Sequence, residues 1–92
     1  MIGRILSNRY KLIGELGSGG MAWVYLAQDL VDGQAVAVKI LYPQLSQDSG
    51  FVQRFVREAR LSMALSRSAE LPNIVCVLDY GADRNTYYLV ME

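Results

Sequence analysis

The chain has 92 residues, enough for one small domain, and its nine basic and nine acidic residues cancel to a net charge of zero. Without a basic excess, the composition disfavours a protein that binds nucleic acid or an anionic membrane surface. The chain has no histidine and a single cysteine, so it lacks the commonest general base and any internal disulfide. No apolar run approaches the roughly 20 residues of a membrane-spanning helix, and the N-terminus lacks the pattern of a secretion signal, so we expect a cytoplasmic protein.

Three strands are predicted in the first half of the chain. After a loosely held lead-in over residues 1–8, alternating apolar and polar side chains predict a strand over residues 10–16. A second strand is predicted over residues 23–28, closed by a turn at Asp32-Gly33. The third strand, rich in valine, is predicted over residues 35–42, where a proline follows.

The second half of the chain is predicted to hold one helix and two strands. Residues 51–66 contain no turn residue, and Phe51, Phe55 and Ala59 recur at helical spacing. A loop, a fourth strand, its turn and a fifth strand are predicted over residues 67–73, 74–78, 79–85 and 86–91. This order indicates an α+β fold, a five-stranded antiparallel sheet with one main helix. Because the sequence stops directly after an apolar strand, we expect residues 1–92 to be part of a larger domain.

The stretch Leu16–Tyr25 holds three glycines between two predicted strands. Glycine lets the backbone approach a ligand closely and adopt positive φ, and successive exposed N–H groups suit a phosphate. A dinucleotide-binding fold needs a helix after the glycines, whereas a strand is predicted here, so a nucleotide-dependent oxidoreductase is excluded. A Walker A loop needs Gly-Lys-Ser/Thr, which the stretch lacks. The stretch predicts a hairpin lying over nucleotide phosphates or, taken alone, an ordinary glycine-rich turn.

Lys39 and Glu58 are candidate partners of that hairpin. Lys39 is the only cation of its apolar strand and shares a face with Ala35 and Ala37, whose small side chains leave space for a flat ligand. The alternative is a lysine that reaches water from an edge strand. Glu58 lies in the middle of the predicted helix, where it pairs either with Arg54 on the same helix or with Lys39 on the sheet.

Together these motifs resemble the N-terminal lobe of a protein kinase, of the kind found in bacterial Ser/Thr kinases of eukaryotic type. The resemblance extends over nearly the whole chain, and several individually weak motifs occur in the family's order and roughly its spacing. The matching segments are Arg9-Tyr10-x-Leu12, Leu16-Gly17-x-Gly19-Gly20-Met21-x-x-Val24-Tyr25, Val36-Ala37-Val38-Lys39, Phe55-x-x-Glu58-Ala59, Pro72-Asn73-Ile74-Val75, Asp79-x-Gly81 and Tyr88-Leu89-Val90-Met91-Glu92.

The resemblance implies an ATP site. It implies that Lys39, held by an ion pair with Glu58, contacts the α- and β-phosphates, and that the helix carrying Glu58 is a mobile switch. The residues implied to cover the phosphates are Gly17, Ser18, Gly19, Gly20, Met21 and Ala22. The residues implied around the adenine, up to the hinge, are Leu16, Val24, Ala37, Val75, Met91 and Glu92.

The chain departs from the family's pattern at three points. Ala22 stands in place of the third glycine, and Leu71 stands where a histidine often precedes the Pro-Asn-Ile-Val segment. The His-Arg-Asp loop, its metal-binding asparagine and Asp-Phe-Gly are missing from these 92 residues. The resemblance therefore implies a lobe of an enzyme that uses ATP, Mg²⁺ and a protein substrate, with no metal ligands in this segment and no activity of the segment alone. The alternative is a non-catalytic module, either pseudokinase-like or dedicated to interaction.

Overall fold

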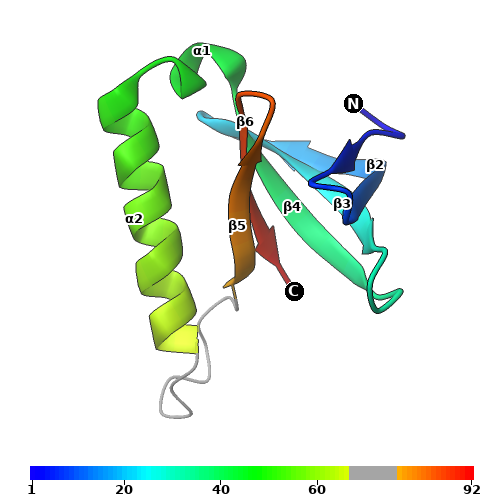
Figure 1. The fold of residues 1–92 in the computed structure, drawn as a ribbon. Helices are drawn as coiled ribbons and strands as arrows, with labels where there is room; N and C mark the ends of the chain where they lie inside the picture. Colours follow the sequence, from blue (N-terminus) through cyan, green and yellow to red (C-terminus); the bar gives the residue numbers. More distant parts are fainter. Residues whose placement is uncertain (67–76) are drawn as a thin grey trace.

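The computed structural model describes residues 1–66 and 77–92. In these ranges one antiparallel sheet has the strand order β1-β2-β3-β4-β6-β5. The strands are β1 (Ile5–Leu6), β2 (Tyr10–Ser18), β3 (Ala22–Asp29), β4 (Ala35–Leu41), β5 (Val77–Asp83) and β6 (Thr86–Met91), and the helices are α1 (Pro43–Ser46) and α2 (Ser49–Ser66). Helix α2 lies alongside β5, and α1 sits at one end of the sheet (Figure 1).

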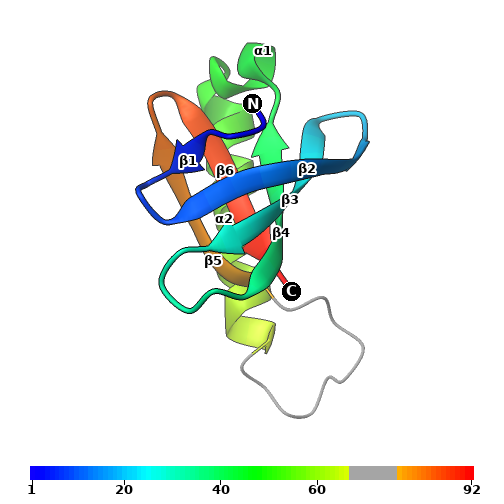
Figure 2. The same cartoon turned by 90° about the vertical axis from the view of Figure 1, so that its right-hand side faces the viewer.

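One core lies between the body of the sheet and the curled β1–β2 segment. Figure 2 shows β2 crossing in front of β6 while α2 lies behind the sheet. The residues buried in this core are Leu6, Tyr10, Leu12, Tyr25, Ala27, Val36, Val38, Ile40, Tyr88 and Val90. On β4 the period of two directs Val36, Val38 and Ile40 into this core and leaves Ala37 and Lys39 half-buried on the opposite face, as the sequence predicts.

A second core lies on the opposite face, beneath α2. Phe55 and Ala59 are buried there against Leu41, Val77 and Leu89. The helical spacing read from the sequence therefore identifies the buried side of α2. Burial of this stripe anchors α2 over β5 and β6. On the same face of β3 and β4, Val24, Leu26, Ala37 and Lys39 remain half-buried.

The prediction of five strands is wrong, because the N-terminal lead-in forms a sixth. Residues 5–6 pair with β2, and the Leu6 side chain is fully buried. The Gly3 N–H donates to the Leu12 carbonyl at 2.7 Å, and the Leu12 N–H donates to the Arg4 carbonyl at 2.9 Å. A left-handed turn at residues 7–8 returns the chain into β2. The α+β class is confirmed.

The turn predicted over residues 79–85 is also wrong. Strand β5 continues to Asp83, and the reversal occurs at Arg84 and Asn85, whose φ angles are 50° and 64°. The Tyr10 hydroxyl donates to Asp79 Oδ2 at 2.7 Å, which satisfies this carboxylate within the strand. The short helix α1 was not predicted. The predicted loop over 67–73 and residues 74–76 of the fourth strand lie outside the described residues.

The turn at Asp32-Gly33 is confirmed, with Gly33 at a φ of 76°. Asp29 anchors this turn, because its Oδ1 accepts the Val31 N–H at 2.9 Å and its backbone carbonyl accepts the Gly33 N–H at 2.7 Å. Neither α1 nor α2 is long and apolar enough to cross a membrane.

A candidate nucleotide site beneath the β2–β3 hairpin

A cavity of about 480 Å³ lies beneath the hairpin that joins β2 to β3. Every residue that lines it belongs to the set that the resemblance to protein kinases implies for an ATP site. The lining residues are Leu16, Gly17, Ser18, Gly19, Gly20, Met21, Ala22, Val24 and Lys39. Segments from three strands therefore bring the glycine-rich stretch and Lys39 to a single concave surface.

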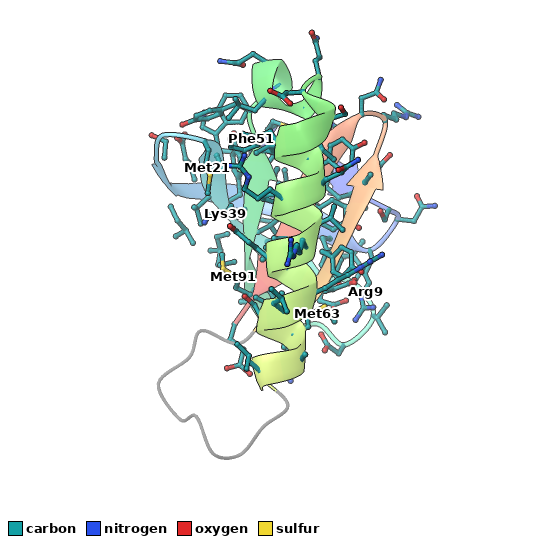
Figure 3. The ribbon with its side chains drawn as sticks, turned by 90° about the vertical axis from the view of Figure 1, so that its left-hand side faces the viewer. Arg9, Met21, Lys39, Phe51, Met63 and Met91 are labelled. Atoms are coloured by element: carbon teal, nitrogen blue, oxygen red, sulfur yellow. The ribbon has the colours of Figure 1, made fainter. Side chains whose placement is uncertain are left out.

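The register of the sheet positions the floor of this cavity. Val24 pairs with Gly17 on one side and with Lys39 on the other. Directly paired residues of an antiparallel sheet present their side chains on the same face, so the three positions form one row. In Figure 3 Lys39 lies between Met21 and Met91.

The hairpin is closed by hydrogen bonds between backbone groups. The Gly19 N–H donates to the Ala22 carbonyl at 2.9 Å, and the Tyr42 N–H donates to the Met21 carbonyl at 3.0 Å. Strand β2 carries two register shifts, one between Leu12 and Gly14 and one between Glu15 and Gly17. Bulges of this kind bend a strand, and here they curl β2 ahead of the tip.

Glycine can adopt positive φ, but the glycines of the tip, Gly19 and Gly20, do not. Among the described residues, only Gly3 and Gly33 are glycines with positive φ. A Cβ built on Gly17, Gly19 or Gly20 would meet no other heavy atom within 4 Å. No steric contact within the described part of the chain therefore requires glycine at these three positions.

Of the residues implied around an adenine, Leu16 and Val24 line the cavity, whereas Ala37, Met91 and Glu92 do not. Ala37 pairs directly with Met91, and both side chains are half-buried on the face that carries Lys39. Glu92 is exposed after the end of β6. Leu26, which pairs with Ala37 from β3, belongs to the same half-buried row and was not assigned from the sequence. Val75 lies outside the described residues.

The structure does not bring Lys39 and Glu58 together. Glu58 is exposed on α2, next to the buried Ala59. In residues 1–66 and 77–92 the one ion pair joins Arg9 to Asp29 at 2.9 Å. Helix α2 packs chiefly against β5 and α1, and Lys39 lines the cavity with no carboxylate partner in residues 1–66 and 77–92.

Two aromatic residues at the hairpin were missed by sequence reasoning. Trp23 and Tyr42 meet edge to face, with ring centroids 4.8 Å apart. Because Ala22 pairs with Leu41, Tyr42 continues the ladder opposite Met21, at the tip of the hairpin. The sequence signal for this contact was the position of the two aromatic residues, one at the start of the strand predicted over 23–28 and one at the end of the strand predicted over 35–42.

No group of three or more histidine, cysteine, aspartate or glutamate side chains that could hold a metal ion occurs among the residues that the structure describes. The side chains available to a ligand at the cavity are therefore one ammonium group, a serine hydroxyl and apolar surface, together with backbone N–H groups. Such a set suits an anionic ligand with an apolar part.

Curated proteins with similar sequences are bacterial kinases. Over 92 residues the chain is 42% identical to the serine/threonine-protein kinase PrkC of Bacillus subtilis and 46% identical to a probable serine/threonine-protein kinase of Clostridium acetobutylicum. Both matches cover 100% of the chain. The chain is homologous to the N-terminal lobe of bacterial Ser/Thr protein kinases. It spans 14% and 13% of the length of these two relatives.

Solved structures agree with this relationship. The kinase domain of PknI from Mycobacterium tuberculosis matches with a TM-score of 0.78 and 28% identity, over 100% of this chain and 35% of that one. The kinase domain of PF14_0431 matches with a TM-score of 0.84 at 20% identity, over 100% of this chain and 26% of that one, and shows the fold alone. No family model matches the chain.

Proposed function

We propose that this chain is the ATP-binding lobe of a Ser/Thr protein kinase, which transfers the γ-phosphoryl group of ATP to hydroxyl groups of a protein substrate. The observation that carries the proposal is the cavity shared by the glycine-rich tip and Lys39. Backbone N–H groups and an ammonium group complement the charge of a triphosphate, and none of the described residues that line the cavity is acidic. The three glycines without a steric reason of their own support the close approach of such a ligand.

The adenine would lie on the half-buried row next to the cavity. Ala37 has a small side chain and leaves free space over this face of β4. Val24 and Met91 supply apolar surface on either side. A flat, largely apolar ring is the shape that this surface accommodates. We infer that the ring spans the row and that the phosphates extend beneath the glycines toward Lys39.

We further infer that α2 is a switch. Among the described residues its exposed Glu58 forms no ion pair, and neither does Lys39, which lines the cavity. An ion pair between them would position the lysine against the α- and β-phosphates, as phosphoryl transfer in kinases requires. The arrangement seen here is then the state in which α2 stands away from β4, and activation moves the helix toward the lysine.

The segment by itself is not expected to transfer phosphate. It contains no histidine, hence no His-Arg-Asp loop, and its described residues offer no cluster of metal ligands. Mg²⁺ bound by other residues would neutralise charge on the β- and γ-phosphates. The role of this chain's own residues is to bind and orient ATP.

The test is the substitution Lys39→Met in the whole gene product, with ATP binding measured by calorimetry and phosphate transfer to a generic protein substrate measured with labelled ATP. Hydrogen bonds to charged groups are worth about 1.5–3 kcal/mol, so ATP affinity should fall roughly 10- to 100-fold and transfer should be lost. The control is Lys11→Met, which removes an exposed lysine of β2 outside the cavity. An unchanged ATP affinity in Lys39→Met contradicts the proposal, and ATP binding by the unmodified protein without any transfer favours the non-catalytic module.

A further inference from the structure

Tyr42 ties the tip of the β2–β3 hairpin to the end of β4. Its hydroxyl donates a hydrogen bond to the carbonyl oxygen of Gly19. Its backbone N–H donates to the carbonyl oxygen of Met21 at 3.0 Å, and its ring meets the indole of Trp23 at an interplanar angle of 77°. One residue thus makes three contacts of different kinds with three positions of the hairpin.

The backbone of Tyr42 is held in place by hydrogen bonds to the start of α1. Its carbonyl oxygen accepts the N–H groups of Leu45 and Ser46, at 2.9 and 3.1 Å, and so begins helix α1. Pro43 follows directly at the first turn of that helix, where a proline fits the backbone. The Tyr42 hydroxyl is therefore held at a defined place relative to β4 and α1.

The hydroxyl bond sets the direction of one peptide unit of the tip. A trans peptide is planar, and its C=O and N–H groups point in opposite directions. Since the Gly19 carbonyl is turned toward Tyr42, the N–H of Gly20 points away from it. Gly20 lines the cavity and Tyr42 does not. No acceptor within residues 1–66 or 77–92 takes a hydrogen bond from this N–H.

We propose that Tyr42 is a positioning residue for the nucleotide phosphates. Its hydroxyl holds the Gly19–Gly20 peptide in the orientation that presents the Gly20 N–H to the cavity, as a donor for a phosphate oxygen. Two consecutive glycines without this tether sample many orientations, and ordering them on binding lowers the affinity. The proposal rests on ATP being the ligand of the cavity, and it places the effect of Tyr42 on the phosphates and not on the adenine.

The test compares the affinities of the whole gene product for ATP and for adenosine, measured by calorimetry in the unmodified protein and in Tyr42→Phe. The substitution removes the hydroxyl and keeps the ring against Trp23. One neutral hydrogen bond corresponds to about a 3- to 10-fold change, so ATP should bind about 3- to 10-fold more weakly while adenosine binding stays unchanged. The matched control is Tyr88→Phe, which removes a hydroxyl bonded to Ser7 Oγ at 2.7 Å, outside the cavity, and should change neither affinity.

Each outcome decides a different claim. A selective loss of ATP affinity in Tyr42→Phe supports the positioning role. Equal ATP affinity in the unmodified protein and Tyr42→Phe overturns it, and so does an equal loss for ATP and adenosine, which would indicate a general structural effect. If the unmodified protein binds no ATP, the proposed function itself fails, and the role of Tyr42 fails with it.

Discussion

Val24 on β3 and Lys39 on β4 stand directly opposite each other, and both side chains line the cavity beneath the hairpin. Gly17 on β2 extends the same row by one strand. The row therefore carries an apolar side chain between a position without a side chain and a cation. On β3 and β4 the side chains of one face, such as Tyr25 and Val38, form the core, whereas Val24 and Lys39 on the other face line the cavity.

Substitution of Gly17 should separate stability from nucleotide binding. A Cβ at this position meets no atom within 4 Å, and its φ is not positive, so Gly17→Ala and Gly17→Val are compatible with the strand. The free energy of unfolding should stay level or rise by up to about 1 kcal/mol, because a side chain restricts the unfolded chain and valine favours strands. ATP affinity should fall, more for valine than for alanine. Chemical denaturation and calorimetry measure the two quantities, and a loss of stability that parallels the loss of affinity would refute this view.

Glu58→Gln should affect activity without affecting the fold. The carboxylate is exposed and forms no ion pair with any described residue, so the free energy of unfolding should change by less than about 0.5 kcal/mol. If α2 moves to pair Glu58 with Lys39, the rate of phosphate transfer by the whole gene product should drop about 10-fold or more. Arg57→Gln neutralises the neighbouring exposed charge on the same helix and serves as the control. Equal rates in both variants would argue against the switch.

Stability should depend on Asp29 at acidic pH. Arg9 donates two hydrogen bonds to its carboxylate, at 3.0 and 2.9 Å, and these hold the pKa of Asp29 below its ordinary value of 3.8. Because the folded pKa lies below the unfolded one, the ionised group stabilises the fold above pH 3.8, and this contribution is lost as the pH falls from there through the folded pKa. Asp29→Asn should be less stable at neutral pH and lose less stability on acidification. Urea denaturation at a series of pH values checks this. If the free energy of unfolding fell equally with pH below 3.8 in the two proteins, the prediction would be wrong.

Gly81 is required by a close approach in the sheet. A Cβ at this position would lie 2.8 Å from the Tyr88 hydroxyl oxygen and 3.0 Å from Cζ. Tyr88 is buried, and its hydroxyl is bonded to Ser7, so the ring cannot move aside without breaking a contact. Gly81→Ala should lower the free energy of unfolding by about 1–3 kcal/mol. In a Tyr88→Phe background the nearest atom is gone and the same substitution should cost less, whereas strict additivity in thermal unfolding would exclude this contact as the cause.

The strands predicted from alternation were placed well because the pattern reflects which face is buried. On β4, Val36, Val38 and Ile40 enter the core under β2, as the period of two indicates. Strand β1 has only two residues and thus no pattern to read, and it forms because Leu6 finds a place in that core. The Asp79-Tyr80-Gly81 segment has the composition of a turn, yet it pairs as a strand because Tyr10 satisfies the Asp79 carboxylate from a distant part of the chain.

In the candidate site, too, some features follow from local strand pairing and others depend on contacts between distant parts of the chain. The cavity beneath the glycines was predictable, because strand pairing alone brings Gly17, Val24 and Lys39 into one row. The absence of an ion pair between Lys39 and Glu58 in the described residues was not, since it depends on how α2 packs against β5. The tether from Tyr42 to Gly19 joins positions 23 residues apart, and no periodicity in the sequence encodes it.

The edge-to-face contact between Trp23 and Tyr42 also gives the chain an optical reporter of its own. Trp23 is the only tryptophan among the 92 residues, and its indole contacts the ring of Tyr42, the residue directly before α1. Indole emission responds to the polarity and the quenching groups around the ring, so opening or closing of the glycine-rich tip should change the fluorescence of this segment without any attached dye. The motion of the hairpin could then be followed in real time as nucleotide is added.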